Sequence, residues 1–260
     1  MFESAVALDR SFALAHAGVA YVCARIYDTF ERESVWIERC SAASGRAIAL
    51  QPNLAEALVA QAWVFYGDKN YTEAIRCARE AIHLKPHCDG VYHILGSAYF
   101  ASDRWQEAFD CVVQALEANG DDYNTYIPFI NAVQALHRDE EASKLQHKQA
   151  EVLEKQIKAV PEDMRARNLV ANLYAYFGRS EEAENEMKMA VALRPNDPSI
   201  LYNAACLYAV LGNKQEALAM LAKCKAAGFR DANWARRDPD LACVHGEPEF
   251  ERLYPASSEG

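Results

Sequence analysis

The sequence predicts an all-α fold in which antiparallel helical hairpins stack into an α-solenoid. The first observation is a repeat with a period of about 34 residues, because Ala74, Ala108 and Ala142 follow one another at equal intervals. Pro52 and Pro86 are separated by the same period, so two residue types keep the same phase. Glycine (11) and proline (9) are scarce in 260 residues, which favours long helices joined by short turns. We expect about 13 to 15 helices and no sheet.

The period divides the chain into successive hairpins, in which small residues let the two helices approach and proline ends the second helix. The first hairpin carries eight extra residues between Ala24 and Arg39. The fourth carries seven, which predicts a longer second helix from about Asp139 to Ala159. Residues 1–12 are predicted to form the second helix of a truncated repeat. The predicted hairpins are 13–54, 55–88, 89–122, 123–163, 164–197 and 198–229, and a cap and tail follow at 230–260.

The third hairpin shows most clearly which residue types fill the period. Its first helix has Tyr92, Leu95, Gly96 and Tyr99, and its second has Ala108, Val112 and Ala115. This pattern resembles the tetratricopeptide repeat (TPR), and the resemblance covers nearly the whole chain. It implies a right-handed superhelix whose first helices line a concave groove. It also implies that the partner is a protein or a peptide segment.

Both ends of the chain depart from the repeat. Phe2–Leu8 resembles a second helix without its first, so the chain looks cut from something longer. The C-terminal segment resembles the ending of TPR arrays in bacterial multidomain signalling proteins, whose other domains are kinases, nucleotide cyclases or transcriptional regulators. Terminal repeats need a cover for their apolar face. The side chains expected to supply it are Trp234, Leu241, Phe250 and Leu253.

The composition limits the kinds of partner. A formal net charge of −10 disfavours nucleic acid and anionic membranes, whose phosphates are bound by clustered Lys and Arg. No apolar run approaches the about 20 residues that span a bilayer, and the N-terminus does not read as a signal peptide. The eight cysteines form no CxxC pair, which is typical of a reducing compartment. We therefore expect a cytoplasmic protein whose partners are neither nucleic acid nor membrane.

The sequence contains no recognisable catalytic motif. It has neither a GxGxxG nor a GxxxxGK[ST] phosphate loop, and it has no HExxH zinc motif. His83, His87 and Cys88 have a spacing that could suggest zinc, but Pro86 interrupts the helix between them. We therefore predict no catalytic residue, no metal site and no cofactor, and a scaffold rather than an enzyme.

The groove positions that the TPR resemblance implies give a set of candidate partner-binding residues. They are Trp63, Tyr66, His93, Phe100, Asn131, Arg165, Asn168, Asn172, Tyr176, Tyr202 and Asn203. Asparagine is a mediocre helix former, and its amide offers the donor and acceptor of a peptide bond. We expect these residues to hold an extended segment, with Trp63 or Tyr176 as anchor. Two alternatives stay open: the asparagines are plain polar surface, or the array mediates homo-oligomerisation through its ends or outer face.

Overall fold

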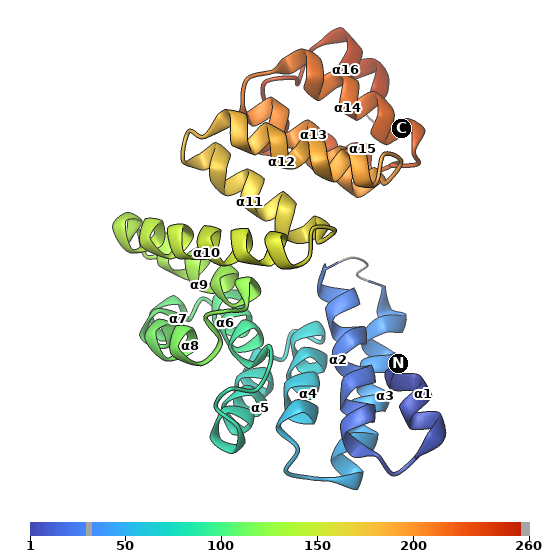
Figure 1. Cartoon of the computed structure of the whole chain (residues 1–260), viewed down its shortest axis with the longest axis vertical. Helices are drawn as coiled ribbons and strands as arrows, with labels where there is room; N and C mark the ends of the chain where they lie inside the picture. Colours follow the sequence, from blue (N-terminus) through green and yellow to red (C-terminus); the bar gives the residue numbers. More distant parts are fainter. Residues whose placement is uncertain (30–32, 256–260) are drawn as a thin grey trace, which may run out of the picture. The chain divides into compact units, whose positions relative to one another are not determined.

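The computed structural model describes residues 1–29 and 33–255, and these residues form helices and turns but no β-strand (Figure 1). The helices are α1 Phe2–Leu8, α2 Ala13–Thr29, α3 Ser34–Leu50, α4 Ala55–Gly67, α5 Tyr71–Leu84, α6 Val91–Ala101, α7 Trp105–Asp110, α8 Val112–Asn119, α9 Tyr123–Ala135, α10 Asp139–Ala159, α11 Met164–Tyr176, α12 Ser180–Leu193, α13 Pro198–Val210, α14 Lys214–Ala226, α15 Ala232–Arg237, the 3-10 helix η1 Pro239–Leu241 and α16 Pro248–Leu253. The all-α prediction is confirmed. The described residues contain one α-helix more than the expected upper limit, because Cys111 divides a second helix into α7 and α8.

Neighbouring helices pack in the order that a stack of hairpins requires. Within hairpins, α2 packs against α3, α4 against α5, α6 against α7, α11 against α12 and α13 against α14. The first helices of successive hairpins also pack on one another, as α2 with α4, α4 with α6, α6 with α9 and α11 with α13. Each of these hairpins therefore buries its apolar face against the next one, as in repeat proteins generally.

The turns inside the second to sixth hairpins each use a left-handed residue at a constant place in the period. Lys69, Asp103 and His137 have φ angles of 59°, 58° and 56° and follow one another at intervals of one period. Gly178 and Gly212, also one period apart, have φ angles of 74° and 79°. Three hairpins therefore place an ordinary residue where glycine alone adopts the conformation without steric cost.

Aspartate side chains mark where three first helices begin. The carboxylates of Asp122, Asp163 and Asp197 accept backbone N–H groups in the first turns of α9, α11 and α13. Such caps satisfy donors that have no partner inside the helix. These three helices begin at the residues where the period starts the corresponding hairpins. The long second helix of the fourth hairpin, α10, runs over the 21 residues that the insertion predicts.

The chain forms two compact units, residues 1–149 and 150–260, and the boundary falls inside α10. In unit 1 the extra residues of the first hairpin lengthen both α2 and α3 to 17 residues, while residues 30–32 lie outside the described part. Gly96 lies where α6 meets α9, and a Cβ there would stand 2.9 Å from Cγ of Pro128. The largest fully buried side chains of this unit are Trp63, Tyr92, Tyr99 and Phe129.

The described part of unit 2 is packed around buried apolar side chains, with Tyr254 and Phe250 the largest, and also buries the cation of Arg167. Arg167 stands in the slot that other hairpins fill with a large apolar residue, and it is buried. Its Nε donates to the carbonyl oxygen of Pro161 at 2.8 Å, and its guanidinium pairs with Glu186 of α12. The ion pair compensates a charge that would otherwise be costly to bury.

The C-terminal cap closes the last hairpin with Leu241 and Phe250 buried as expected and Leu253 half-buried. Tyr254 is buried as well. Trp234 is 59% exposed, so the expectation that it covers the hairpin is wrong. The short helix α15 turns Ala235 toward the core and leaves the neighbouring indole in solvent.

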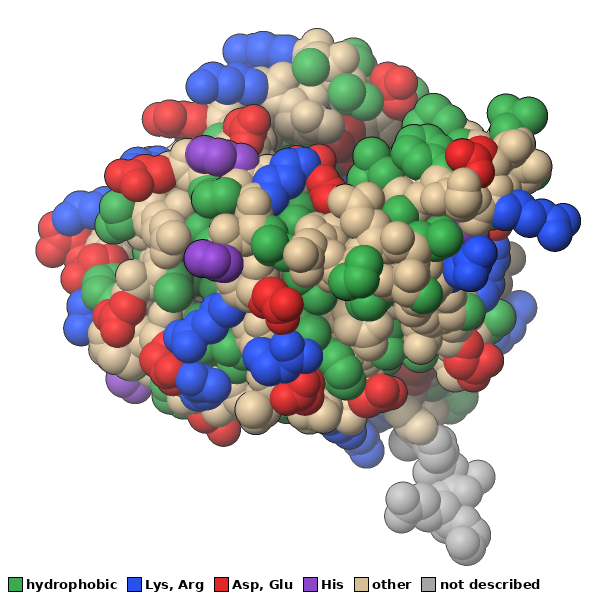
Figure 2. All heavy atoms as spheres, turned by 90° about the horizontal axis from the view of Figure 1, so that it is seen from below, with side chains coloured by type: hydrophobic (Ala, Val, Ile, Leu, Met, Phe, Trp, Pro, Cys, Tyr) green, Lys and Arg blue, Asp and Glu red, His purple; other side chains and the backbone are tan. Residues whose placement is uncertain are grey.

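The surface is mixed in charge, and Figure 2 shows basic and acidic side chains interspersed on one face of the molecule. Among the described residues, no helix combines the length and the apolar composition needed to cross a membrane. The right-handed course of the whole array remains a prediction.

Candidate functional site

The candidate groove residues of unit 1 are largely covered by the protein itself. Trp63 of α4 is fully buried, and its ring packs edge-on against Tyr66 at 5.5 Å and His93 at 5.2 Å between ring centroids. Trp63 therefore belongs to the core and cannot anchor a partner, contrary to the expectation from its slot. Tyr66 is half-buried and also contacts the ring of Tyr71 at 5.7 Å.

Arg25 of the lengthened helix α2 covers His93 and ties three helices together. One guanidinium N–H donates to Oδ2 of Asp28 at 3.1 Å, and the same nitrogen lies 2.9 Å from Nδ1 of His93 in α6. The other terminal nitrogen donates to Oδ1 of Asn124 in α9 at 3.1 Å. Because guanidinium offers donors only, Nδ1 of His93 is the acceptor in this contact. The inner positions at this end of unit 1 are thus engaged in an internal polar network.

Two candidates in unit 1 remain open to solvent. Phe100, at the end of α6, is 37% exposed, and Asn131 of α9 is exposed as well. They lie on neighbouring first helices that pack on each other. This unit therefore offers a smaller accessible inner surface than the repeat pattern alone suggests.

In unit 2 the candidates of α11 form a row along the helix. Asn168, Asn172 and Tyr176 are four residues apart, so their side chains share one face. Arg165 and Asn168 are half-buried, and Oδ1 of Asn168 is inaccessible to solvent. Asn172 is exposed, and Tyr176 is 62% exposed. The accessible part of the row is therefore its C-terminal half.

The corresponding row of α13 is partly covered by the cap. The hydroxyl of Tyr202 donates to Oδ2 of Asp238 at 2.8 Å, and its ring stacks on Phe229 with 4.7 Å between centroids. Tyr202 is buried and Asn203 is half-buried. Tyr202 is therefore a contact between the hairpin and the cap rather than a free binding surface.

Val210, which the candidate set omits, forms an accessible pair with Tyr176. It lies one repeat period after Tyr176, at the end of α13, and it is 56% exposed. Because α11 and α13 pack side by side, the two side chains hold the same slot on adjacent helices. The period itself is the signal that could have identified Val210.

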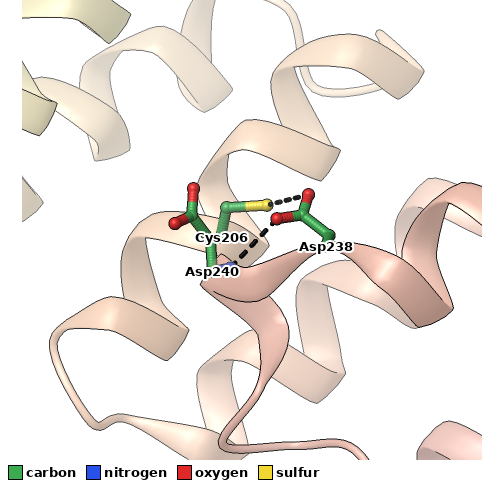
Figure 3. A group of neighbouring side chains, drawn as sticks. All are labelled: Cys206, Asp238 and Asp240. Atoms are coloured by element: carbon green, nitrogen blue, oxygen red, sulfur yellow. Dashed lines mark hydrogen bonds between the residues drawn. The ribbon is translucent and has the colours of Figure 1, made fainter. Parts of the chain in front are cut away.

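Three side chains near the cap contain atoms that metals bind. The ligand atoms of Cys206, Asp238 and Asp240 lie within 4.8 Å of one another. Figure 3 shows that the Cys206 thiol and the backbone N–H of Asp240 both donate to the Asp238 carboxylate. Burial, followed by the charge of Asp238, raises the pKa of the Cys206 thiol, and burial likewise raises the pKa of Asp240. The Asp238 carboxylate also accepts the Tyr202 hydroxyl, so its oxygens are engaged by three donors and the arrangement is a contact between α13 and the cap.

The helical hairpins define the chain as an α-solenoid. Comparison with solved structures specifies the repeat: the fold is that of tetratricopeptide repeat proteins. TTC0263, a TPR protein of Thermus thermophilus, is 20% identical with a TM-score of 0.54, over 73% of this chain and 98% of that one. The APC/C hetero-tetramer Cut9-Hcn1 matches with 13% identity and a TM-score of 0.60, over 97% of this chain and 44% of that one. A human IFIT1 dimer with PPP-AAAA matches with 15% identity and a TM-score of 0.63, over 86% and 53%. No protein-family model and no curated protein sequence matches the chain.

Proposed function

We propose that this chain is a non-catalytic scaffold that binds other proteins, and that the inner face of unit 2 holds an extended segment of a partner. The observation that carries the proposal is the accessible surface formed by Asn172, Tyr176 and Val210. Tyr176 and Val210 are exposed and hold the same slot on two first helices that pack on each other, and the amide of Asn172 lies one turn before the tyrosine.

The chemistry of this surface suits an extended chain. A partly exposed tyrosine can bury a large amphipathic ring against an apolar side chain of the partner, and Val210 widens the apolar area. The amide of Asn172 can donate to one peptide group and accept from another. Affinity then comes mainly from the aromatic anchor, and the backbone contacts position the segment.

Other functions have weaker support. The titratable inner groups named above are engaged inside the protein, His93 with Arg25 and Asp238 with Tyr202, which leaves them poorly suited to acid–base catalysis. A net charge of −10 argues against nucleic acid. A bacterial signalling or regulatory setting rests on the likeness of the cap segment alone. Self-association through the array ends or outer face rests on the sequence pattern alone.

Peptide selection tests the proposal. A library of random peptides is selected on the chain, and the affinity of the best binders is measured by fluorescence anisotropy. Tyr176→Ala should weaken binding about 10-fold or more, and Asn172→Ala less, because aromatic residues carry most interface energy. A matched control exists on the outer helix α12, where Asn185 and Met189 are also exposed and four residues apart.

The double variant Asn185→Ala/Met189→Ala should bind the peptide with a Kd within about twofold of the wild-type value. It also removes an amide and a large apolar side chain, but from α12, which lies outside the proposed binding surface. If the α11 variants bind as tightly as the wild type, or if only the α12 variant loses binding, the inner face of unit 2 is not the site. Circular dichroism of each variant establishes that the fold is kept.

A further inference from the structure

A hollow of about 630 Å³ lies in unit 2, where the second helices α12 and α14 end. The end of α12, the loop after it and the end of α14 line the hollow through Val191, Pro195, Asn196, Lys223, Ala226 and Ala227. Four of these side chains are apolar, one is an amide and one is a cation. None of Asn172, Tyr176 and Val210 lines the hollow, so it is separate from the inner surface proposed above.

The chain around this hollow is basic, although the protein as a whole carries a net charge of −10. Residues 187–196 and 217–230 contain five Lys and Arg residues and no Asp or Glu. The acidic residues that follow the two stretches, Asp197 and Asp231, accept backbone N–H groups at the starts of α13 and α15. The hollow therefore lies in a locally positive part of an acidic protein.

Lys223 differs from the other four cations of these stretches. Those four have an acceptor inside the protein: Lys188 pairs with Glu184, Arg194 with Asp197, and Lys225 and Arg230 donate to the backbone carbonyl oxygens of Leu253 and Lys225. The ammonium of Lys223 is exposed, lines the hollow and has no acceptor among the described residues. A lysine in a last turn also favours the helix dipole, but the dipole does not explain an apolar hollow beside it.

A second hollow, at the equivalent place in unit 1, provides an internal comparison. It has a volume of about 390 Å³ and is lined by the end of α8, the loop after it, Tyr126 and α10. Its residues correspond to those of unit 2 at one spacing, which is two repeat periods and the seven inserted residues of the fourth hairpin. The corresponding pairs are Leu116 with Val191, Gly120 with Pro195 and Lys148 with Lys223.

The two hollows keep the lysine but differ in negative charge. In unit 1, Glu117 and Asp121 line the hollow together with Lys148. At the two acidic positions unit 2 has Ala192 and Asn196, and no carboxylate in the described part of the chain lines its hollow. The lysine of unit 1 thus has counter-charges in its own hollow, whereas the lysine of unit 2 has none there.

We propose that the hollow at the ends of α12 and α14 binds an acidic peptide segment of a partner protein, in which an aliphatic side chain lies next to a carboxylate. The aliphatic side chain packs on Val191, Pro195 and Ala226, and the carboxylate accepts from the ammonium of Lys223. An ion pair beside apolar surface is less screened than one surrounded by water. The exposed amide of Asn196 can donate to a carbonyl oxygen of the segment.

A nucleic acid suits this surface less well than a peptide. Phosphate backbones are bound by several cations clustered on one face. Four of the five cations here are engaged inside the protein, and four of the six lining side chains are apolar. One carboxylate with an aliphatic neighbour matches one free ammonium in an apolar hollow.

Selection of short peptides built from Asp, Glu and aliphatic residues tests the proposal on the 260-residue chain. Fluorescence anisotropy gives the Kd of the best binder for the wild type, for Lys223→Glu and for the matched control Lys148→Glu. Both lysines are exposed, and both variants change the net charge equally, so general repulsion of an acidic peptide cancels in the comparison. Lys223→Glu should raise the Kd about 10-fold or more, because it replaces an attraction by a repulsion. Lys148→Glu should leave the Kd within about twofold of the wild-type value.

A second arm keeps the protein unchanged. The selected peptide is made again with Asn and Gln in place of Asp and Glu, and its Kd should be about 10-fold higher or more. The Kd of the acidic peptide should rise as salt is added, since the exposed ion pair is screened. Tyr176→Ala should leave this Kd unchanged, because Tyr176 does not line the hollow. The result is therefore independent of peptide binding by the inner face.

Four results overturn the proposal. They are a selection that yields no acidic binder, an amide peptide that binds as tightly as the acidic one, equal effects of Lys223→Glu and Lys148→Glu, and a single-stranded oligo(dT) that binds more tightly than the peptide. A loss of binding in Tyr176→Ala also overturns it, but supports the inner face as the peptide site. Circular dichroism of each variant establishes that the fold is kept.

Discussion

Two glycines in helices of unit 1 should respond differently to the same substitution. A methyl group at Gly96 of α6 would lie 2.9 Å from Cγ and 3.2 Å from Cβ of Pro128, and 3.2 Å from Cζ of Phe129. Apolar carbons prefer separations of about 3.5–4.0 Å, and the proline ring has no other rotamer to adopt. At Gly45 of α3, by contrast, no heavy atom of a neighbouring element lies within 4 Å of the new methyl group.

The magnitude follows from two opposing effects. Replacing glycine by alanine inside a helix stabilises by about 1 kcal/mol at either position, because alanine loses less backbone freedom on folding. Only at Gly96 does the methyl group overpack the contact between α6 and α9, which costs about 1–3 kcal/mol. Gly45→Ala should therefore be stabilising. Gly96→Ala should be less stable than Gly45→Ala by about 1–3 kcal/mol, since the helix effect cancels in the comparison.

Urea unfolding followed by tryptophan fluorescence and far-UV circular dichroism measures both variants against the wild type. Three of the four tryptophans lie in unit 1, so fluorescence reports mainly on the unit that carries the substitutions. Equal free energies of unfolding for Gly96→Ala and Gly45→Ala would refute the close approach of α6 and α9. A stabilised Gly96→Ala would show that the helices move apart at little cost.

Three further predictions test the helix contacts, the turns and a buried thiol. Ala183→Leu and Ala108→Leu should each lower stability by about 1–3 kcal/mol through overpacking, because both alanines are fully buried; an unchanged melting temperature in both would contradict their placement at helix contacts. Lys69→Gly should raise the free energy of unfolding by up to about 1 kcal/mol, since relief of a left-handed lysine outweighs the added freedom of the unfolded chain; denaturant unfolding checks this. Burial raises the pKa of the Cys40 thiol to about 12. The unfolded chain therefore loses this proton first, and stability should fall by about 1.4 kcal/mol per pH unit as pH rises from about 9 toward the folded pKa. Cys40→Ala, which places alanine in a slot filled by Ala108 and Ala183 elsewhere, should make the decline between these pH values less steep, and an unchanged slope would count against the buried thiol.

The positions of the helices could be predicted from the sequence because the period encodes them locally. Small residues at a constant spacing, prolines after second helices and polar turns each act within one hairpin. The insertion before Ala183 could be assigned to α10 for the same reason, since seven residues add two turns to a helix without disturbing its neighbours. The division of a second helix at Cys111 has no comparable signal in the sequence.

The availability of the candidate site could not be predicted in the same way. A slot decides the direction of a side chain, but a neighbouring segment decides whether solvent reaches it. Trp63 and His93 are covered, and the covering group for His93 is Arg25, which extends from a helix lengthened by an insertion. The burial of Trp63 and His93 could not be predicted from these two residues alone. The reach of Arg25 depends on where α2 ends and on the distance to α6, which are features of the folded chain.

The two first helices of unit 2, α11 and α13, show how a neighbouring segment decides the exposure of a side chain, because the repeat gives them equivalent positions that can be compared. Asn168, Asn172 and Tyr176 on α11 lie one period before Tyr202, Cys206 and Val210 on α13, so the two rows have the same directions. On α13 the first two positions donate to Asp238 of the cap, and only the last stays open. On α11 the last two are open. The cap therefore covers part of this face from one side, and the residues that stay open are the ones to which the proposed function assigns partner binding.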